Sequence, residues 1–315
     1  MQMTSLTYLD DVIHNPATAI TVGTFDGVHL GHRTLISKLV EKAREINGRS
    51  VLVTFNPHPR EVLHGGHNTV GLLTTLEERA EILHQSGVDQ MVVIPFDRDF
   101  SLLSSEEFIK DILFRKIGIA EFIIGYDHQF GKNREGTIKT VEQLSPALGY
   151  NVHLIQAHEV AHHTVSSTLI RKALVDEGDV KLARTMLGRP YPLSGMVVHG
   201  DKKGRMLGFP TANLKIEETR KVIPRKGVYA VEVLLDDKVY KGMLNIGIRP
   251  TVTNSKELRI EVNMFDFFDD IYGRQLRVRF YDKIRDEKKF DGLDALRAQL
   301  HQDKADCIQL FKTLS

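Results

Sequence analysis

The chain has 315 residues, which is long enough for two compact domains with separate hydrophobic cores. Its formal net charge of +1 gives no electrostatic support for a nucleic-acid-binding surface or a basic membrane-binding patch. The apolar runs are strand-sized, the first residues do not resemble a signal peptide, and the single cysteine, Cys307, excludes an internal disulfide. These features predict a cytoplasmic protein without membrane or nucleic-acid partners, and they leave self-association open.

The N-terminal half alternates strand-sized apolar runs with helical patterns. Strands are expected at 19–22, 50–55, 91–94, 121–124 and 151–155, and helices at 31–46, 76–85, 106–116 and 138–148. Apolar strands separated by helices predict a doubly wound α/β fold, in which helices cover both faces of a parallel sheet. Such a sheet binds ligands at the carboxyl ends of its strands. We therefore expect the chemistry just after Val22, Phe55 and Ile124.

The pattern changes after one further helix, which is expected at 167–183. The segment Leu187-Gly-Arg-Pro-Tyr-Pro192 interrupts the helical pattern, so we predict two domains, 1–186 and 187–315. Strands are then expected at 193–199, 227–235, 239–246, 258–265 and 276–280, followed by a pair of helices at 293–301 and 305–311. Short strands separated by turns in this order predict a small antiparallel β-barrel.

The most informative motif is Gly23-Thr-Phe-Asp-Gly-Val-His-Leu-Gly-His32, which follows a strand and opens a helix. Free backbone N–H groups and the positive end of the helix dipole favour a phosphate at such a junction. The glycines allow a sharp turn and a close approach of the ligand. His29 and His32 can donate hydrogen bonds to phosphate oxygens during a transfer reaction. A glycine-rich turn with two incidental histidines is the alternative.

This segment resembles the His-x-Gly-His nucleotidyltransferases, and more closely the bacterial bifunctional riboflavin kinase/FMN adenylyltransferase family. Three stretches extend the resemblance: Phe55-Asn-Pro-His-Pro59, Gly125-Tyr-Asp-His-Gln-Phe-Gly131 and Ser166-Ser-Thr-Leu-Ile-Arg171. The resemblance implies a Rossmann-like first domain in which His29 and His32 are catalytic. It implies ATP-binding roles for Gly23, Phe25, Asp26, Gly31, Ser166, Thr168 and Arg171, and flavin-binding roles for Asn56, His58 and Asp127.

Simpler interpretations exist for the individual stretches. Residues Ser166 to Thr168 would cap a helix, and Arg171 could bind phosphate or lie in solvent. The two prolines after Phe55 also fit a stiff turn without a ligand. His128 stands where the family more often has an aromatic residue such as Phe, so the resemblance implies a difference in flavin packing there.

A competing motif, His158-Glu-Val-Ala-His162, matches the zinc-protease pattern His-Glu-x-x-His. That chemistry requires a helix, because both imidazoles must share one face while the glutamate activates water. The motif follows a predicted strand closely and precedes the β-branched pair Thr164-Val165, which favours a connecting loop. Glu177 is available as a third ligand, but nothing singles it out.

The second domain carries Gly204-Arg-Met-Leu-Gly-Phe-Pro-Thr-Ala-Asn213. Thr211 and Asn213 supply oxygen atoms of the kind that Mg²⁺ prefers. Taken by itself, the segment also fits a basic turn.

Its second half resembles the riboflavin kinase motif Gly-x-Pro-Thr-Ala-Asn, which implies a riboflavin kinase-like barrel. The same resemblance implies that Gly208 and Pro210 bind ATP, that Thr211 and Asn213 bind Mg²⁺, that Glu261 is the catalytic base, and that Arg285 lies in a flap over the flavin. Asn263 stands where family members often have histidine, and asparagine does not titrate as histidine does. Taken alone, Glu261 also fits a surface carboxylate on an alternating strand.

The resemblance implies two consecutive reactions. Riboflavin and ATP give FMN and ADP in the barrel, and FMN and ATP then give FAD and pyrophosphate in the α/β domain, with Mg²⁺ at both sites. The expected partners are therefore the small molecules ATP, riboflavin, FMN and FAD. The alternatives are another His-x-Gly-His transferase, a zinc protease, and a flavin-sensing module without turnover.

Overall fold

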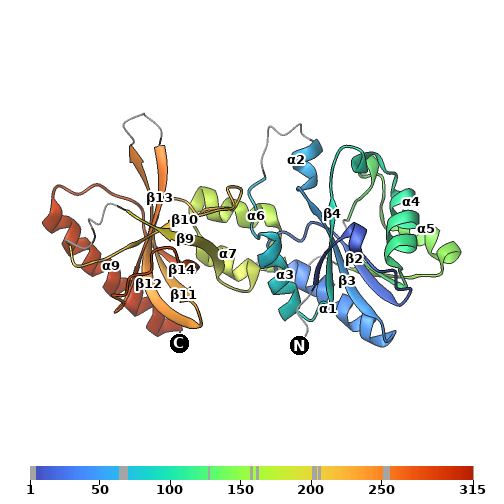
Figure 1. Cartoon of the computed structure of the whole chain (residues 1–315), viewed down its shortest axis with the longest axis horizontal. Helices are drawn as coiled ribbons and strands as arrows, with labels where there is room; N and C mark the ends of the chain where they lie inside the picture. The colour runs from blue at the N-terminus through green and yellow to red at the C-terminus, as the bar shows by residue number, and fades with distance from the viewer. Residues whose placement is uncertain are drawn as a thin grey trace. The chain divides into compact units, whose positions relative to one another are not determined.

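The computed structural model describes residues 5–63, 70–126, 128–156, 159–160, 163–200, 204, 207–250 and 256–314. The chain forms two compact units, Met1–Ser167 and Thr168–Ser315 (Figure 1). Among the described residues, no helix combines the length and the apolar character needed to cross a membrane.

The first unit contains a six-stranded parallel sheet with the strand order β1-β4-β3-β2-β5-β6. Its strands are β1 (Ser5–Tyr8), β2 (Thr18–Val22), β3 (Arg49–Asn56), β4 (Gln90–Pro95), β5 (Glu121–Gly125) and β6 (Asn151–Ile155). The predicted doubly wound sheet is confirmed. The edge strand β1 was not predicted, because four residues of alternating character give only a weak strand signal.

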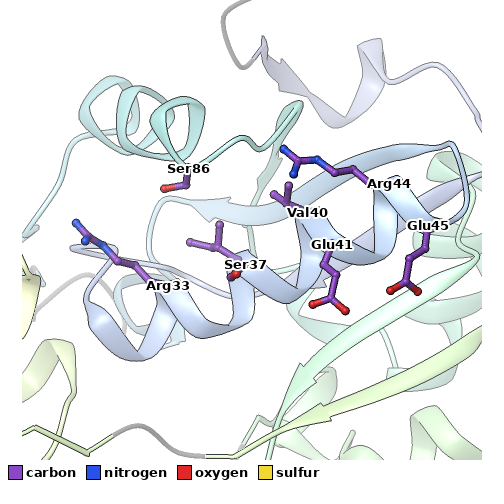
Figure 2. Close-up of a pocket in the computed structure, with 8 residues that line it drawn as sticks. Arg33, Ser37, Val40, Glu41, Arg44, Glu45 and Ser86 are labelled. Atoms are coloured by element: carbon purple, nitrogen blue, oxygen red, sulfur yellow. The ribbon is translucent and has the colours of Figure 1, made fainter.

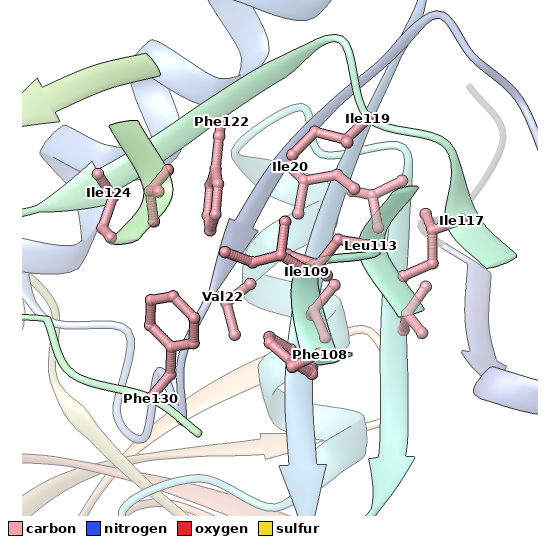
Figure 3. Packing of buried hydrophobic residues seen from close by; sticks show 14 of the residues in the cluster. Ile20, Val22, Phe108, Ile109, Leu113, Ile117, Ile119, Phe122, Ile124 and Phe130 are labelled. Carbon is pink, nitrogen blue, oxygen red and sulfur yellow. The ribbon is translucent and has the colours of Figure 1, made fainter. Parts of the chain in front are cut away.

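Helices cover both faces of this sheet. They are α1 (Leu30–Glu45), α2 (Pro59–Leu63), α3 (Leu76–Gln85), α4 (Ser105–Glu107), α5 (Ile138–Leu148) and the π-helical η3 (Phe108–Ile117), with short 3₁₀ turns η1 (Leu9–Asp11), η2 (Phe100–Leu102) and η4 (Lys132–Arg134). Alternate residues of β2 point to opposite faces: Ile20 packs with η3 and β5, and Ala19 packs with α1. Figure 3 shows side chains of β2, β5 and η3 meeting in the first of these clusters.

The strand order determines where a ligand is expected in this unit. Strand β2 lies between β3 and β5, and the chain builds outward from β2 in both directions. The order therefore reverses between the carboxyl ends of β2 and β5, and doubly wound sheets bind ligands at such a reversal. The loops that begin at Gly23 and Tyr126 border this point, and the loop after Asn56 follows the neighbouring strand.

The helix predicted at 167–183 is wrong as a single element. The structure has α6 (Ser167–Lys172), a π-helical turn η5 (Ala173–Glu177) and α7 (Val180–Leu187). The break occurs at Gly178, whose φ is +69°, and a Cβ there would lie 2.8 Å from the hydroxyl oxygen of Tyr229. Helix α7 packs against the barrel. Compactness thus groups residues 168–186 with the barrel, whereas the sequence pattern changes at 187.

The second unit contains a closed antiparallel barrel with the order β10-β13-β12-β11-β14-β9, as predicted. Its strands are β9 (Tyr191–Val198), β10 (Ala212–Lys215), β11 (Gly227–Leu235), β12 (Lys238–Pro250), β13 (Lys256–Met264) and β14 (Gln275–Arg285). Strand β10 was not predicted, because four residues give only a weak strand signal. Its position matters, since it includes Asn213 of the second motif.

A continuous helix, α9 (Leu293–Leu314), replaces the predicted helix pair. The prediction failed because Gln302-Asp-Lys-Ala305 has the polar character of a linker. In the structure these residues lie on one helix, and Asp303 is buried against the barrel, where Arg285 neutralises its charge. Helix α9 packs against β11, β12 and β14.

Candidate active sites

The loop from Gly23 to His32 joins β2 to α1 and has an unusual backbone. Phe25, Gly27 and Val28 have positive φ angles of +47°, +85° and +40°. Only glycine adopts this region readily, and a β-branched residue is rare there. Each such non-glycine residue costs roughly 1–3 kcal/mol and persists only where its surroundings enforce the conformation. The loop, called the phosphate loop below, is therefore held in a specific shape.

The two histidines of the motif lie together, as predicted. Their rings stack with centroids 3.6 Å apart, and the ring of Phe25 lies 4.8 Å from that of His32. His29 caps α1, because its Nδ1 accepts a hydrogen bond from the backbone N–H of His32 at 3.4 Å. A neutral imidazole that accepts at Nδ1 carries its proton on Nε2. The bond to His32 thus leaves the ring proton of a neutral His29 on Nε2.

Two of the predicted glycines make room for these rings. A Cβ on Gly31 would lie 3.3 Å from the ring of His29, and one on Gly23 would lie 3.0 Å from the ring of Phe25. A methyl group at either position would therefore push a ring out of its place. Both glycines therefore have a packing role beside these rings.

Asp26, a predicted ATP-binding residue, directs its carboxylate into the protein. It is almost completely buried and accepts hydrogen bonds from the backbone N–H groups of Leu73 and Thr74 at 2.9–3.0 Å. The guanidinium of Arg79 lies 3.6 Å away. The backbone carbonyl of Asp26 accepts a hydrogen bond from the hydroxyl of Ser167 at 2.8 Å. Asp26 therefore connects the phosphate loop to two other segments.

The Ser166–Arg171 stretch starts beside the phosphate loop. Ser167 is the first residue of α6, and the carbonyl oxygen of Val165 would lie 3.7 Å from a Cβ on Gly31. Ser166 lies between these two residues. Thr168 and Arg171 follow on α6, in the second compact unit, with Thr168 exposed and Arg171 half-buried. Ser167, which sequence reasoning did not single out, makes the contact to the loop.

The predicted flavin-binding residues follow the neighbouring strands. Asn56 ends β3 and precedes a cis peptide bond to Pro57, and Nδ1 of His58 accepts a hydrogen bond from the N–H of Arg60 at 3.1 Å. His128 follows β5, with its ring 5.9 Å from that of Phe130. Asp127 lies outside the described residues.

A group of phenylalanines adjoins these residues at the carboxyl ends of the strands. Neighbouring rings have centroids 5.5–6.4 Å apart, and the group consists of Phe55, Phe96, Phe100, Phe108 and Phe130. Phe55, Phe96 and Phe100 are only half-buried. Sequence reasoning missed Phe96 and Phe100, although two aromatic residues directly after β4 are a usable signal. An aromatic surface of this kind can receive a flat ring system.

The zinc-protease interpretation is wrong, because the part of the motif that the structure describes is a strand and not a helix. Glu159–Val160 (β7) pairs antiparallel with His163–Thr164 (β8) in a hairpin. His158 and His162 lie outside the described residues. Within the part of the chain that is described, no group of three His, Cys, Asp or Glu side chains could hold a metal ion.

In the barrel, the predicted catalytic residue Glu261 lies between two asparagines. It is paired in register with Asn213 of β10 on one side and with Asn245 of β12 on the other. Partners in register project to the same face of a sheet. The neighbours of Glu261 along β13, Ile260 and Val262, are buried on the opposite face. The row Asn213–Glu261–Asn245 therefore lies on the outer face of the barrel.

The charge of Glu261 has a neighbour on its own strand. The guanidinium Nη1 of Arg259 lies 3.8 Å from Oε1 of Glu261, and both side chains are partly exposed. Sequence reasoning identified Glu261 and Asn213 as site residues, gave no role to Asn245, and did not single out Arg259. Their register becomes visible only when the strands are paired.

The predicted ATP-binding segment of the barrel, residues 207–211, is held from two sides. Phe209 is buried in a cluster with Cys307 and Phe311 of α9, and the side chain of Arg297 donates to the carbonyl of Leu207 at 3.3 Å. On the other side, Asn263 donates from Nδ2 to the carbonyl of Pro210 at 2.7 Å. Gly208, with a φ of +82°, makes the turn. Thr211 follows Pro210 and precedes β10.

The contact of Asn263 explains its departure from the family pattern. Its side chain is 6% exposed and acts as a hydrogen-bond donor to a backbone carbonyl. An imidazole N–H can make the same kind of bond. Neither residue needs to titrate for this role, so asparagine is a suitable replacement for histidine at this position.

Arg285 was predicted to bind the flavin, and the structure gives it a second task. Its guanidinium binds both carboxylate oxygens of the fully buried Asp303 at 2.8 Å, and Gln299 donates to the same carboxylate at 2.8 Å. Paired, bidentate bonds of this type are the strong ones. Arg285 thereby joins the end of β14 to α9.

Comparisons with known proteins decide what these two sites belong to. The FAD synthetase family model matches residues 12–169, and the riboflavin kinase model matches residues 187–311. A bifunctional riboflavin kinase/FMN adenylyltransferase from Escherichia coli (strain K12) is 39% identical over 306 residues, covering 95% of this chain and 96% of that protein. The chain belongs to the bifunctional riboflavin kinase/FMN adenylyltransferase family. The family predicted from the motifs is thus confirmed.

Other relatives agree with this assignment to the family. The bifunctional riboflavin kinase/FMN adenylyltransferase from Bacillus subtilis (strain 168) is 36% identical over 300 residues, covering 94% of this chain and 93% of that protein. A solved structure from Streptococcus pneumoniae, described as a macrolide-efflux protein, has a TM-score of 0.87 and 33% identity, covering 96% and 98% of the two chains. Its description refers to transport, whereas both halves of the present chain match enzyme families.

One surface depression of this family member lies outside the motifs. It has a volume of about 680 Å³ and runs along α1 toward the end of α3 (Figure 2). Its lining is of mixed charge: Arg33, Ile36, Ser37, Val40, Glu41, Arg44, Glu45 and Ser86. The two glutamates already pair with lysines of α1 at 2.5 Å. None of the predicted site residues lines the depression.

Proposed function

We propose that the chain makes FAD in two steps, each with its own set of residues. Residues 187–315 phosphorylate riboflavin to FMN, and residues 1–186 transfer the adenylyl group of ATP to FMN. The supporting observation is that the chain holds two separate loops suited to phosphate. Stacked His29 and His32 accompany the first loop, and the row of Asn213 and Glu261 follows the second.

In the kinase step, the carboxylate of Glu261 accepts the proton of the ribityl 5′-hydroxyl. The hydroxyl oxygen attacks the γ-phosphorus of ATP, a new O–P bond forms, and the bond to the β-phosphate oxygen breaks to release ADP. Asn213 and Asn245 flank the carboxylate and can orient the hydroxyl and the phosphate oxygens. The guanidinium of Arg259, 3.8 Å from Oε1 of Glu261, places a positive charge beside this carboxylate.

Magnesium fits the donor set of this site. Thr211 offers a hydroxyl, Asn213 an amide oxygen and Glu261 a carboxylate, all of them oxygen donors that suit a hard cation. A Cβ on Gly200 would lie 2.1 Å from the side-chain amide of Asn213, so glycine leaves the space that this side chain occupies. When bound by Thr211 and Asn213, Mg²⁺ would offset the negative charge of the ATP phosphates.

In the adenylyltransferase step, a phosphate oxygen of FMN attacks the α-phosphorus of ATP and pyrophosphate leaves. No protein nucleophile is needed, so catalysis depends on positioning and on stabilisation of charge. The Nε2–H of His29 and the adjoining imidazole of His32 lie at the amino end of α1, where negative charge is favoured. The half-buried Phe55, Phe96 and Phe100 offer the flavin ring an apolar surface beside Asn56.

Product analysis with variants of the full chain tests the division of labour. The His32→Ala variant should lose FAD formation from FMN and ATP, yet still convert riboflavin to FMN. The Glu261→Gln variant should show the reverse. His14→Ala and Glu217→Gln are matched controls, because both residues are exposed and lie outside the two motifs. Loss of both activities in one folded variant would contradict the assignment of one reaction to each set of residues.

A further inference from the structure

A group of buried polar side chains lies against the phosphate loop. Thr54 ends the buried part of β3, Thr74 precedes α3, and Arg79 lies on α3. All three are at most 4% exposed. None belongs to a motif found in the sequence. Buried polar groups need hydrogen-bond partners, so the question is where their bonds go.

The hydrogen bonds of this group lead to the phosphate loop. Arg79 donates from Nη1 to Oγ1 of Thr54 at 3.0 Å, and Thr54 donates in turn to the carbonyl of Thr24 at 3.1 Å. Oγ1 of Thr74 accepts from the backbone N–H of Gly27 at 3.0 Å. The same hydroxyl lies 3.1 Å from the carboxylate of Asp26, to which it donates. The loop is thus bound at Thr24, Asp26 and Gly27.

These attachment points surround the strained part of the loop. Phe25 and Val28 are the non-glycine residues of this loop that have positive φ angles. Thr24 and Asp26 flank Phe25, and Gly27 directly precedes Val28. Such conformations persist where the surrounding structure over-determines them. The three bonds are made to the carbonyl of Thr24, the carboxylate of Asp26 and the N–H of Gly27. Together they hold the loop on both sides of Phe25.

We propose that Thr54, Thr74 and Arg79 are positioning residues of the FMN adenylyltransferase. They hold the phosphate loop, and with it the ring of Phe25 and the paired histidines, in the shape that receives the triphosphate before ATP binds. The inference rests on the proposed function of the first domain. They act through the loop, since these hydrogen bonds run to protein groups of the loop and its neighbours. Losing them should lower kcat more than it raises KM, because misplaced groups fail chiefly in the transition state.

The test replaces the hydroxyl of Thr54 without changing the size of the side chain. Thr54→Val removes the bond to Thr24, and Thr54→Ser keeps it. Thr74→Val and Thr74→Ser form a second pair on the other side of the loop. For each full-length variant, kcat and KM are measured for FAD formation from FMN and for FMN formation from riboflavin, together with the thermal melting curve.

We expect each valine variant to lose about tenfold in kcat for FAD formation, each serine variant to recover most of it, and riboflavin phosphorylation to stay at its wild-type rate. Equal kcat values in valine variants and wild type would overturn the inference. So would equal losses in valine and serine variants, or a parallel loss of both activities. Failure of the wild-type chain to make FAD would instead contradict the proposed function, which keeps the two failures distinguishable.

Discussion

The two units hold the segments that we propose to bind phosphate in different ways. In the first, a buried network of hydroxyl, carboxylate and guanidinium groups binds the loop at three points, through Thr54, Thr74 and Arg79. In the second, Phe209 anchors the segment in an apolar cluster, and the side chains of Arg297 and Asn263 donate to the carbonyl oxygens of Leu207 and Pro210. This difference in how the segments are held follows from their backbone conformations. The first loop contains two strained non-glycine residues and is held by directional bonds, whereas the second segment turns at a glycine and is held largely by an apolar anchor.

Each unit also contains an Asp–Arg pair whose carboxylate is buried, and the two pairs have different roles. Asp26 belongs to the phosphate loop, and Arg79 approaches it at 3.6 Å while backbone N–H groups make the shorter bonds. In the barrel, Arg285 and Asp303 form a bidentate pair at 2.8 Å that joins β14 to α9. The first pair shapes a loop, and the second fastens a helix. Changes to the second should therefore affect stability most.

The largest expected effect is on the barrel's ion pair. Asp303→Ala leaves the partly buried Arg285 without its carboxylate, and breaking a buried pair costs about 3–5 kcal/mol. Asp306→Ala is the matched control, because Asp306 is exposed on the same helix. Denaturant unfolding of the full chain measures the free energies. Equal losses in the two variants would show that the pair does not fasten α9.

The second-largest effect tests whether Gly200 is needed for the space that it leaves rather than for its backbone conformation. Gly200→Ala places a Cβ 2.1 Å from the side chain of Asn213, although the backbone of Gly200 lies outside the left-handed region. Displacing Asn213 by about 1 Å should lower riboflavin phosphorylation by about 100-fold. FAD formation from FMN should be unchanged and serves as the internal control. Unchanged kinase activity would mean that Asn213 does not contribute its side chain.

A smaller effect is expected where asparagine replaces histidine. Asn263→Leu leaves the carbonyl of Pro210 without its donor, which costs about 1–3 kcal/mol and should weaken kinase kcat/KM for ATP by about tenfold. Asn263→His should restore most of the activity, since an imidazole N–H can donate in its place. If leucine and histidine variants behave alike, the bond to Pro210 has no part in positioning the segment.

The smallest effect concerns the apolar anchor itself. Burial, with a lesser contribution from Asp303 and Asp306, raises the pKa of the Cys307 thiol to about 12. Because the raised pKa favours the neutral thiol, Cys307 should stay unreactive toward a thiol reagent at pH 8 and react fully in denaturant. Rapid labelling of the folded enzyme would show that the cluster around Phe209 opens in solution.

Both fold classes could be predicted, because apolar periodicity reports burial directly. The elements that were missed lack such a signal. Strands β1 and β10 have four residues each, which is too short for a clear periodic pattern. The break at Gly178 has a local signal that was overlooked, because Gly178 adopts the left-handed conformation and Asp179 caps α7. Within α9, the polar stretch around Asp303 is helical, and the buried Asp303 pairs with the distant Arg285.

The sequence by itself determined which chemical groups this protein carries: two phosphate-binding segments, a histidine pair, and a glutamate suited to act as a base. Tertiary structure decided what holds those groups in place. Asp26 and Thr74 are 48 residues apart, and Asn213 pairs with Glu261 across strands. Hydrogen bonds and register between distant segments leave no periodic trace in a sequence, because they arise only when the chain has folded.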